Sequence, residues 1–325
     1  MTIYIDAMGG DHAPLEIVKG AYLAAKEFAT PLTLIGDTDI IDEIVKKENL
    51  TSDKISLIDA KQNISMDEEP ANAVRKKKDA SVVVAALKVK EDPGSVFVSA
   101  GSTGAVLSAA LLYTGRIKGI QRPALCTLLP GETPVLLIDN GANAECKPEY
   151  LVQFAIMGSA YMQAVMGIEN PRVALANIGA EEIKGTPLYK ETHQLLKETD
   201  INFIGNLEPK ELLNGCADVL VCDGFTGNII LKTLEGSFLY TFGLLKKIFM
   251  SGIKTKLAAG LLKKDLYALK KTMDPSTVGG VPLLGINGGV IKAHGSSDAE
   301  AFKNAIGQAI KFQQNNVVGK ITNML

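Results

Sequence analysis

Short, mostly apolar runs recur along this chain, and several of them are apolar at every residue. A strand without polar alternation is typical of a parallel sheet that is covered on both faces. Segments with helical spacing, such as 15–28, 150–165 and 187–198, separate the runs. The strand-like runs occupy residues 3–6, 32–35, 55–58, 96–99, 124–129, 135–139, 173–177, 203–204, 219–222 and 290–293. This order predicts an α/β fold with three layers, α/β/α, around a largely parallel sheet.

Glycine-rich loops follow many of these runs. The first run leads into "DAMGGDHAP" (6–14), and the run at 96–99 leads into "SAGSTGA" (99–105). Similar loops are "DNGANAECKPE" (139–149), "NIGAEEIKG" (177–185), "CDGFTGN" (222–228) and "KAHGSSD" (292–298). Ligands of open parallel sheets bind beyond the carboxyl ends of the strands, so we expect these loops to converge on one edge of the sheet. The alternative is a set of tight turns that serve packing alone.

The loop "SAGSTGA" has the features of a phosphate-binding loop. Its small residues let backbone N–H groups approach an anion, and the start of the following helix adds unpaired N–H groups and the positive end of a dipole. Ser102 and Thr103 add hydroxyl donors beside Gly101 and Gly104. Side-chain amides near the other loops can also donate to phosphate or carbonyl oxygens; these belong to Asn140, Asn143, Asn177, Asn206 and Asn228.

Several common site motifs are absent from the sequence. It contains no G-x-x-x-x-G-K-[ST], no G-x-G-x-x-G after the first run, no H-E-x-x-H and no G-x-S-x-G. The three histidines lack the spacing of a metal site, and His193 lies among polar residues of a helical segment, where we expect it at the surface. We therefore expect neither a metal nor another cofactor. The formal net charge of −2 argues against a dedicated nucleic-acid binder.

No linker rich in Pro, Gly or Ser and no internal repeat divides the 325 residues. We expect a single α/β catalytic domain over residues 1–325, with a protruding pair of long helices at 229–273 within it. The chain enters a strand pattern at once, which indicates no signal peptide, and no charge-free stretch is long enough to span a membrane. The four cysteines form no C-x-x-C pair, as is usual for reduced thiols of a cytoplasmic protein.

Residues 229–273 have two parts of different character. The first part, up to Leu245, is apolar on nearly every face. A helix of this kind must be buried all round, and a homodimer interface is the simplest way to bury it. The second is basic, because residues 246–271 contain eight lysines and one aspartate beside leucines at helical spacing. That face suits anionic lipid headgroups or an acidic partner protein, and the alternative is a dimer-packing helix with a solvated face. We expect the contact at Lys254, Lys256, Leu257, Leu261, Lys263 and Lys264.

Seven short motifs run in order from Asp6 to Asp298: "DAMGGDHAP", "SAGSTGA", "GRIKGIQRPAL", "DNGAN", "FIGN", "DGFTGN" with Lys232, and "KAHGSSD". In this combination the chain resembles the bacterial fatty acyl-acyl-carrier-protein:phosphate acyltransferase family. The resemblance implies transfer of a fatty acyl group from acyl-carrier protein to inorganic phosphate, giving acyl phosphate for membrane phospholipid synthesis. It also implies a homodimer and a fold similar to that of phosphate acetyltransferase and isocitrate/isopropylmalate dehydrogenases. Under the resemblance we also expect contact with the inner face of the membrane and with a membrane acyltransferase that acts downstream of this reaction.

The implied reaction asks for positioning and for stabilisation of an oxyanion. Phosphate is substantially dianionic near neutral pH and needs little help from a base, and a thiol with a pKa of about 8.5 needs only modest help from an acid. Under the resemblance we expect Lys184 and Asn228 to polarise the thioester carbonyl, with Asp223 or Asp6 orienting them. His12 then donates to phosphate or protonates the thiolate, unless it is a loop histidine bonded to backbone.

The catalytic candidates are thus Lys184, Asn228, His12 and Asp223. Lys292 and His294 are expected to form a second cationic corner. The expected phosphate- and substrate-binding residues are Asp6, Gly9, Gly10, Asp11, Gly101, Ser102, Thr103, Gly104, Asn143, Asn177, Thr226, Gly227, Lys292 and His294.

Two other functions are compatible with parts of the sequence. A metal-dependent 2-hydroxy-acid dehydrogenase of similar fold would need clustered aspartates and an arginine trio, but no third arginine joins Arg116 and Arg122. A non-catalytic module that binds carrier protein or membrane would need the basic segment without the loops, whereas both are present.

Overall fold

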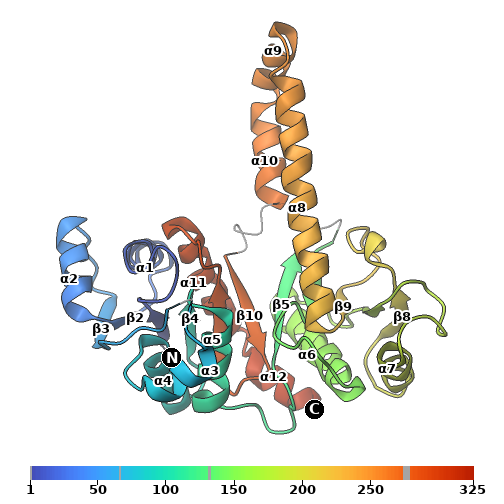
Figure 1. Ribbon diagram of the computed structural model, residues 1–325, viewed down its shortest axis with the longest axis horizontal. Coiled ribbons are helices and arrows are strands. Elements are labelled where there is room, and N and C mark those ends of the chain that lie inside the picture. The colour runs from blue at the N-terminus through green and yellow to red at the C-terminus, as the bar shows by residue number, and fades with distance from the viewer. Residues whose placement is uncertain (1, 66, 131–132, 274–278) are drawn as a thin grey trace.

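The computed structural model describes residues 2–65, 67–130, 133–273 and 279–325, and it leaves the side chains of residues 270–273 undescribed. Within these ranges, eleven strands form one sheet in the order β3-β2-β1-β4-β11-β10-β5-β6-β9-β7-β8. Figure 1 shows this sheet between its helices. Their bounds are β1 Ile3–Asp6, β2 Leu32–Gly36, β3 Ile55–Asp59, β4 Val96–Ser99, β5 Ala124–Leu129, β6 Val135–Ile138, β7 Val173–Ala176, β8 Phe203–Leu207, β9 Val219–Val221, β10 Gly280–Leu284 and β11 Gly289–Ala293. The prediction of a three-layer α/β fold with a largely parallel sheet is confirmed.

The strand direction reverses in the middle of the sheet. The strands β3, β2, β1, β4 and β11 are mutually parallel, and so are β6, β9, β7 and β8. Between these two runs, β10 is antiparallel to both of its neighbours and β5 is antiparallel to β6. The expectation that all glycine loops share one edge of the sheet is therefore wrong, because three antiparallel steps point the two runs in opposite directions.

The twist of the sheet partly offsets this reversal. Neighbouring strands rotate by about 20–25°, so the five steps from β4 to β9 turn the strand direction by roughly 100–125°. Combined with the reversal, the two strands are then about 55–80° apart in direction.

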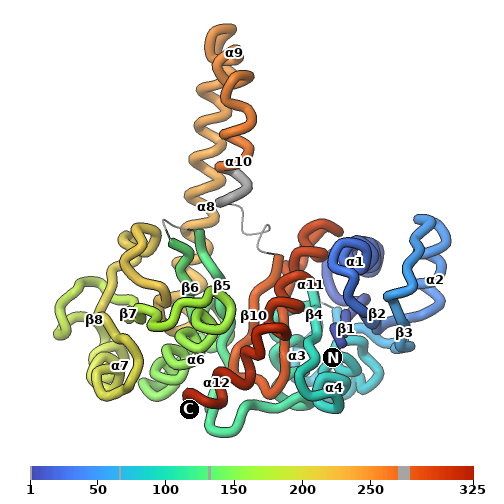
Figure 2. Tube along the Cα trace, turned by 180° about the vertical axis from the view of Figure 1, so that it is seen from behind, coloured from blue at the N-terminus to red at the C-terminus, as the bar shows by residue number. Residues whose placement is uncertain are grey.

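Helices cover both faces of the sheet. They are α1 Leu15–Phe28, α2 Thr38–Lys47, α3 Pro70–Lys76, α4 Ser81–Glu91, α5 Thr103–Ala109, α6 Pro148–Met166, α7 Pro187–Lys197, α11 Ala299–Gln314 and α12 Val317–Met324. Two single turns, η1 Ala110–Thr114 and η2 Pro209–Glu211, follow α5 and β8. Figures 1 and 2 show α3, α4 and α5 on one side of the first parallel run and α11 on the other. Each strand end is thus held between two layers of packed side chains.

Three helices project from this body. The helix α8 (Gly224–Phe249) extends outward, and α9 (Ile253–Leu261) and α10 (Lys263–Met273) fold back beside it (Figures 1 and 2). Within one chain the apolar helix is not buried all round, because Leu239 and Tyr240 on α8 are 73% and 70% exposed. Its burial in a homodimer interface stays a prediction. The apolar pattern of the sequence predicts that α8 packs against other protein, but α8 projects away from the body of its own chain (Figure 1).

No helix among the described residues is both long enough and apolar enough to cross a bilayer.

The helix α6 packs flush against the second parallel run at Gly158. A Cβ atom at this position would lie 2.7 Å from Val219 Cγ1 and 3.3 Å from Ile138 Cγ2. We expect Gly158→Ala to lower the free energy of unfolding by about 1–3 kcal/mol, the usual cost of adding atoms to a filled core. In a Val219→Ala background, which removes Cγ1, the same substitution should cost measurably less. Urea denaturation of the four proteins in this cycle measures both effects, and additive costs would contradict the proposed contact.

Candidate functional site

A buried carboxylate lies at the carboxyl end of β1. Asp6 is 1% exposed, and its two oxygens accept hydrogen bonds from Ser81 Oγ at 2.5 Å and Ser99 Oγ at 2.6 Å. The backbone N–H of Met8 donates to the same carboxylate at 3.3 Å. Burial raises the pKa of Asp6, and the hydrogen bonds from Ser81 and Ser99 oppose that rise. The carboxylate fixes the start of the first loop, which the sequence analysis had placed in the site.

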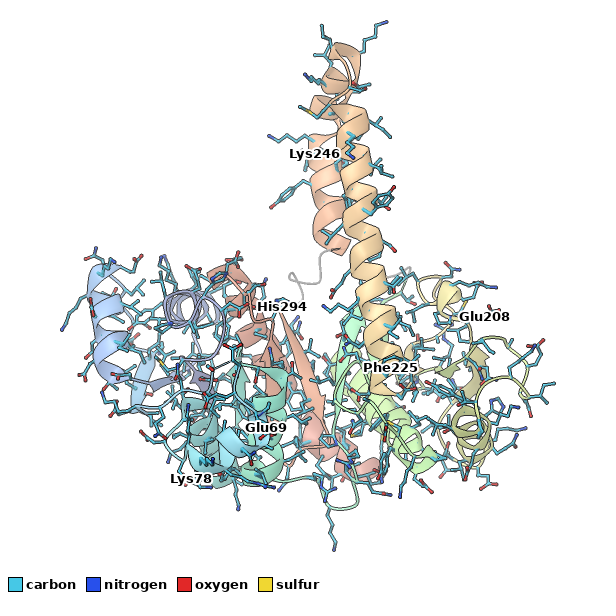
Figure 3. The ribbon with its side chains drawn as sticks, in the orientation of Figure 1. Glu69, Lys78, Glu208, Phe225, Lys246 and His294 are labelled. Carbon is cyan, nitrogen blue, oxygen red and sulfur yellow. The ribbon has the colours of Figure 1, made fainter. Side chains whose placement is uncertain are left out.

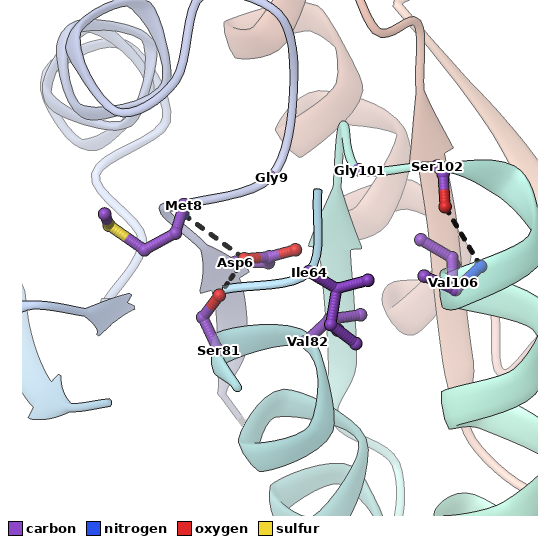
Figure 4. A pocket seen from close by; sticks show the side chains of 10 residues that line it. Asp6, Met8, Gly9, Ile64, Ser81, Val82, Gly101, Ser102 and Val106 are labelled. Carbon is purple, nitrogen blue, oxygen red and sulfur yellow. Dashed lines mark hydrogen bonds between the residues drawn. The ribbon is translucent and has the colours of Figure 1, made fainter. Parts of the chain in front are cut away.

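The first loop lies directly against the loop that follows β4. A Cβ atom at Gly9 would be 2.5 Å from Asp6 Oδ2 and 2.9 Å from the backbone nitrogen of Gly101, so only glycine fits there. A pocket opens at this contact, with Ser102 at its far side (Figure 4). It is lined by Asp6, Met8, Gly9, Ile64, Ser81, Val82, Gly101, Ser102, Ala105 and Val106. The structure therefore brings together four of the predicted site residues, namely Asp6, Gly9, Gly101 and Ser102.

The role expected for Gly104 changes with the structure. A Cβ atom at Gly104 would lie 2.6 Å from Pro70 Cγ of α3, so packing alone explains this glycine. Ser102 is the N-cap of α5 and accepts a hydrogen bond from the Ala105 N–H at 3.2 Å, while Thr103 is exposed.

The loop after β11 lies beside the first loop. The Asp11 N–H donates to the Gly295 carbonyl at 2.8 Å, and a Cβ atom at Gly10 would lie 3.3 Å from the same oxygen. Lys292 is only 9% exposed, whereas His12 and His294 are exposed. His294 Nδ1 lies 2.9 Å from Ser296 Oγ. The structure thus places Lys292 and His294, the two residues of the predicted second corner, on the segment that contacts Asp11.

A second buried carboxylate ends β6. Asp139 is fully buried and accepts hydrogen bonds from the N–H groups of Leu125, Gly141, Ala142 and Asn143, at 2.7–3.2 Å, and from the Asn143 side chain at 2.9 Å. Burial raises the pKa of Asp139, and these hydrogen bonds oppose the rise. The loop that contains Asn143 is folded around this one side chain.

The N-terminus of α8 packs onto that loop. The Gly224 N–H donates to the Asn143 carbonyl at 2.7 Å, and a Cβ atom at Gly227 would lie 1.9 Å from the Asp139 carbonyl oxygen. Asp223 caps the helix by accepting from the Thr226 N–H at 2.8 Å and its hydroxyl at 2.9 Å. The predicted residues Asn143, Asp223, Thr226 and Gly227 are therefore one cluster.

Tyr189 joins this cluster to the loop that contains Lys184. Its hydroxyl donates to Asp223 Oδ2 at 2.6 Å, and the side chain is 8% exposed at the start of α7. Asn177 Nδ2 donates to the Lys184 carbonyl at 3.2 Å and so closes the same loop. The side chains of Lys184 and Asn228 are both exposed. Rigid, buried partners thus surround two side chains that stay open to a ligand.

His193 is not at the surface, contrary to expectation. It is 3% exposed, its Nδ1 lies 3.0 Å from Asn206 Oδ1, and its ring packs edge-on against Phe203 at 5.0 Å between centroids. Glu182 lies 3.6 Å from its Nε2. The polar neighbours along the helix gave the wrong prediction, because His193 faces Phe203 and Asn206 of β8 and not solvent.

Across the described residues, no hydrogen bond joins the Asp6 cluster to the Asp139 cluster. Figure 3 labels His294 and Phe225, which lie at the carboxyl ends of β11 and β9 on the two sides of the central strands. Ser81, Ser99 and Tyr189 also belong to these clusters, although the sequence did not predict them as site residues. Ser99 could have been found, since it is both the last residue of a predicted strand and the first residue of "SAGSTGA", but Ser81 and Tyr189 meet their partners only through the fold.

The residues of these clusters do not favour a metal site or a cysteine nucleophile. Among the residues that the structure describes, no group of three or more His, Cys, Asp or Glu side chains is placed to hold a metal ion. Burial raises the pKa of the Cys146 thiol, beside Asp139, to about 12, so this cysteine is not an activated nucleophile. The exposed polar groups of these loops include the Asn228 amide, the Thr103 hydroxyl, the Lys184 ammonium and the imidazoles of His12 and His294. Such groups suit binding of anions and stabilisation of an oxyanion.

Known structures share the fold at low sequence identity. A phosphotransacetylase from Streptococcus pyogenes superposes with a TM-score of 0.64 at 17% identity, covering 98% of this chain and 94% of that one. A 4-hydroxythreonine-4-phosphate dehydrogenase from Klebsiella pneumoniae gives a TM-score of 0.59 at 12% identity, covering 97% and 99%. These likenesses confirm the expected phosphate acetyltransferase-like fold.

Sequence relatives are much closer. The family model described as "Fatty acid synthesis protein" matches residues 1–320. The phosphate acyltransferase of Clostridioides difficile (strain 630) is 48% identical over 327 residues, covering 100% of this chain and 96% of that protein. The phosphate acyltransferase of Geobacillus sp. (strain WCH70) is 48% identical over 325 residues, covering 99% and 97%. Identity at this level over the whole length confirms the resemblance inferred from the motifs, and the chain belongs to the phosphate acyltransferase family.

Proposed function

We propose that this protein transfers a fatty acyl group from the thioester of acyl-carrier protein to inorganic phosphate, giving acyl phosphate for membrane phospholipid synthesis. The observation that carries the proposal is the glycine contact between the loops after β1 and β4, where Gly9 lies against Gly101 at a pocket. Backbone approach this close suits a small oxyanion such as phosphate, in a chain that matches phosphate acyltransferases over its length.

The proposed division of roles follows the two clusters. Gly9, Gly10, Gly101, Ser102 and Thr103, with Asp11 and His294 at the rim, bind phosphate and adjoining substrate groups, and His12 donates to phosphate or protonates the thiolate. Lys184 and Asn228 polarise the thioester carbonyl. Asp223 orients them through Tyr189 and the first turn of α8, because it holds both segments by hydrogen bonds. Asn143, Asn177, Thr226 and Gly227 shape the loops that present these two side chains.

The reaction itself is tested with purified acyl-carrier protein carrying a fatty acyl thioester. Incubation with this protein and phosphate should yield acyl phosphate and free carrier thiol in equal amounts, and omission of phosphate should abolish both. Formation of a reduced nicotinamide from a 2-hydroxy acid, without acyl phosphate, would instead support the dehydrogenase alternative. Binding of carrier protein without turnover would support a non-catalytic module.

Removal of either polarising side chain should slow the chemistry. Lys184→Ala and Asn228→Ala are each expected to lower kcat by at least about a hundredfold, the typical loss for one oxyanion donor. Because both side chains are exposed, thermal unfolding should be almost unchanged. Lys190→Ala is the matched control, since Lys190 is another exposed lysine close to Lys184 and should retain full turnover. Near-normal kcat in Lys184→Ala would remove this residue from the proposed site.

A homodimer is the arrangement we propose for the projecting helices, within a single catalytic domain over residues 1–325. The base and middle of α8 expose large apolar side chains in one chain, including Phe225 at 64%, Ile229 at 51% and Leu239 at 73%. Large apolar side chains exposed along one helix are typical of an interaction site. A second copy of α8 has the same length and the same apolar face, so it can cover the first.

The tip of the projection is proposed to meet the inner face of the membrane and the membrane acyltransferase that uses the product. Leu257 and Leu261 on α9 are 68% and 87% exposed, and Ile253 is 81% exposed. The exposed lysines beside them are Lys254, Lys256, Lys263 and Lys264. Apolar side chains flanked by lysines suit an anionic lipid surface, where each lysine contributes about 1 kcal/mol. The same charges suit an acidic carrier protein.

Liposome flotation distinguishes these contacts. Binding should require anionic lipid, weaken with added salt, and be lost in the Leu257→Glu/Leu261→Glu double variant, because two charges replace the exposed apolar tip. Acyl phosphate synthesis from acyl-carrier protein should persist in that variant. The control Leu23→Glu, at a 42% exposed leucine of α1, should float normally. Unchanged flotation of the double variant would rule out this tip as the membrane contact.

A further inference from the structure

Three residues lie level with one another at the ends of the adjacent strands β1, β4 and β11. In the parallel register Asp6 is opposite Ser99, and Ser99 is opposite Lys292. Neighbouring strands are about 4.8 Å apart, so the backbones of Asp6 and Lys292 are separated by roughly 10 Å. The row therefore places a buried carboxylate and a lysine on either side of a serine.

The three side chains project from the same face of the sheet. The residues two positions earlier on each strand are Tyr4, Phe97 and Val290, which belong to one buried cluster under α4 and α5. Side chains alternate along a strand, so Asp6, Ser99 and Lys292 follow on that face. This is the face on which Asp6 meets Ser81 of α4 and lines the pocket.

The ammonium group of Lys292 is buried without a carboxylate in direct contact. The side chain is 9% exposed, and its Nζ donates to the Ala293 carbonyl. None of the ion pairs within the described ranges includes it, although the negative charges of Asp11 and Asp6 act on it. A lysine ammonium has three N–H donors, so most of its donor capacity is left for a ligand.

Burial also makes this lysine a stronger acid than usual. It lowers the pKa of Lys292 to about 8, against the opposing effect of Asp11 and Asp6. The leaving thiol of a thioester has a pKa of about 8.5, and proton transfer between groups of matched pKa is the favourable case for general acid catalysis. The neighbouring strand contributes Ser99, which is opposite Lys292 in the register, and His294 follows two residues later.

We propose that Lys292 is the general acid that protonates the leaving thiolate, an inference that rests on the proposed acyl transfer. A phosphate oxygen forms a bond to the carbonyl carbon, the C–S bond breaks, and its electron pair stays on sulfur. Sulfur takes a proton from Nζ. The neutral amine then takes the remaining proton of the transferred phosphate group, which is more acidic once acylated. The thioester and HPO₄²⁻ thus give the acyl phosphate dianion and a neutral thiol, with the enzyme unchanged.

The test compares two leaving groups. One substrate is an acyl-pantetheine, whose alkyl thiolate needs a proton, and the other is the 4-nitrothiophenyl ester of the same acid, whose thiolate leaves as a stable anion. Lys292→Arg keeps the positive charge but holds its proton too tightly to donate it. It should lower kcat with acyl-pantetheine by about a hundred- to ten-thousandfold and leave kcat with the aryl thioester within about threefold.

His12→Gln is the matched control for the alternative acid. If Lys292 donates the proton, His12→Gln lowers the rates with the two thioesters by the same factor. A selective loss with acyl-pantetheine in His12→Gln, or an equal loss with both thioesters in Lys292→Arg, would overturn the proposal. Full activity of Lys292→Arg with acyl-pantetheine would do the same.

The wild-type protein gives an independent measurement that needs no folded variant. A general acid acts in its protonated form, so kcat with acyl-pantetheine should fall as the pH rises through about 8 while kcat with the aryl thioester stays level. Parallel profiles would count against Lys292. The wild-type protein is also assayed with acyl-carrier protein as the acyl donor. Absence of acyl phosphate with that donor would instead refute the proposed function itself, so the two failures are distinguishable.

Discussion

Buried carboxylates at strand ends determine the shape of both loop clusters. A carboxylate removed from water needs hydrogen-bond donors, and the nearest donors are the backbone N–H groups of the chain that follows it. Around Asp139 this requirement folds the next four residues into a turn, onto which the first turn of α8 packs. Around Asp6 the donors are two serines and the Met8 N–H, and the glycines of the adjoining loops come into contact.

Rigid loops of this kind suit a reaction that depends on positioning more than on a reactive side chain. The buried groups are satisfied by one another, whereas Lys184, Asn228 and His12 are exposed. Preorganised donors cost little reorganisation when charge develops on a substrate oxygen. Tyr189 contributes to this preorganisation. Its hydrogen bond to Asp223 links the segment after the Lys184 loop to the helix that carries Asn228.

Much of the sheet could be read from the sequence, because buried parallel strands leave uninterrupted apolar runs. The bounds of β1, β4 and β5 agree with the predicted runs. The strand β10 was missed, since Pro282 and the flanking glycines are unusual inside a sheet, and with it the reversal of direction was missed. Glycine loops at strand ends predicted segments that the fold does bring into contact, such as the loops after β1 and β4. Ser81, however, reaches Asp6 from 75 residues away, a pairing that no local pattern contains.

The projecting helices show what an apolar pattern can and cannot predict. Exposure of apolar surface to water destabilises a helix that is apolar on most faces, by about 25 cal/mol per Å² of exposed apolar surface. The pattern of α8 therefore predicts cover, yet it does not say what provides the cover. The helices α9 and α10 cannot provide all of this cover, because they fold back along only part of α8. They leave Leu239, Tyr240 and Ile248 between 59% and 73% exposed. The apolar base of α8 suits packing against a second copy of the chain. The tip at α9, which mixes leucine with lysine, suits an anionic surface. The change of composition along the projection therefore separates a dimer contact from a surface contact.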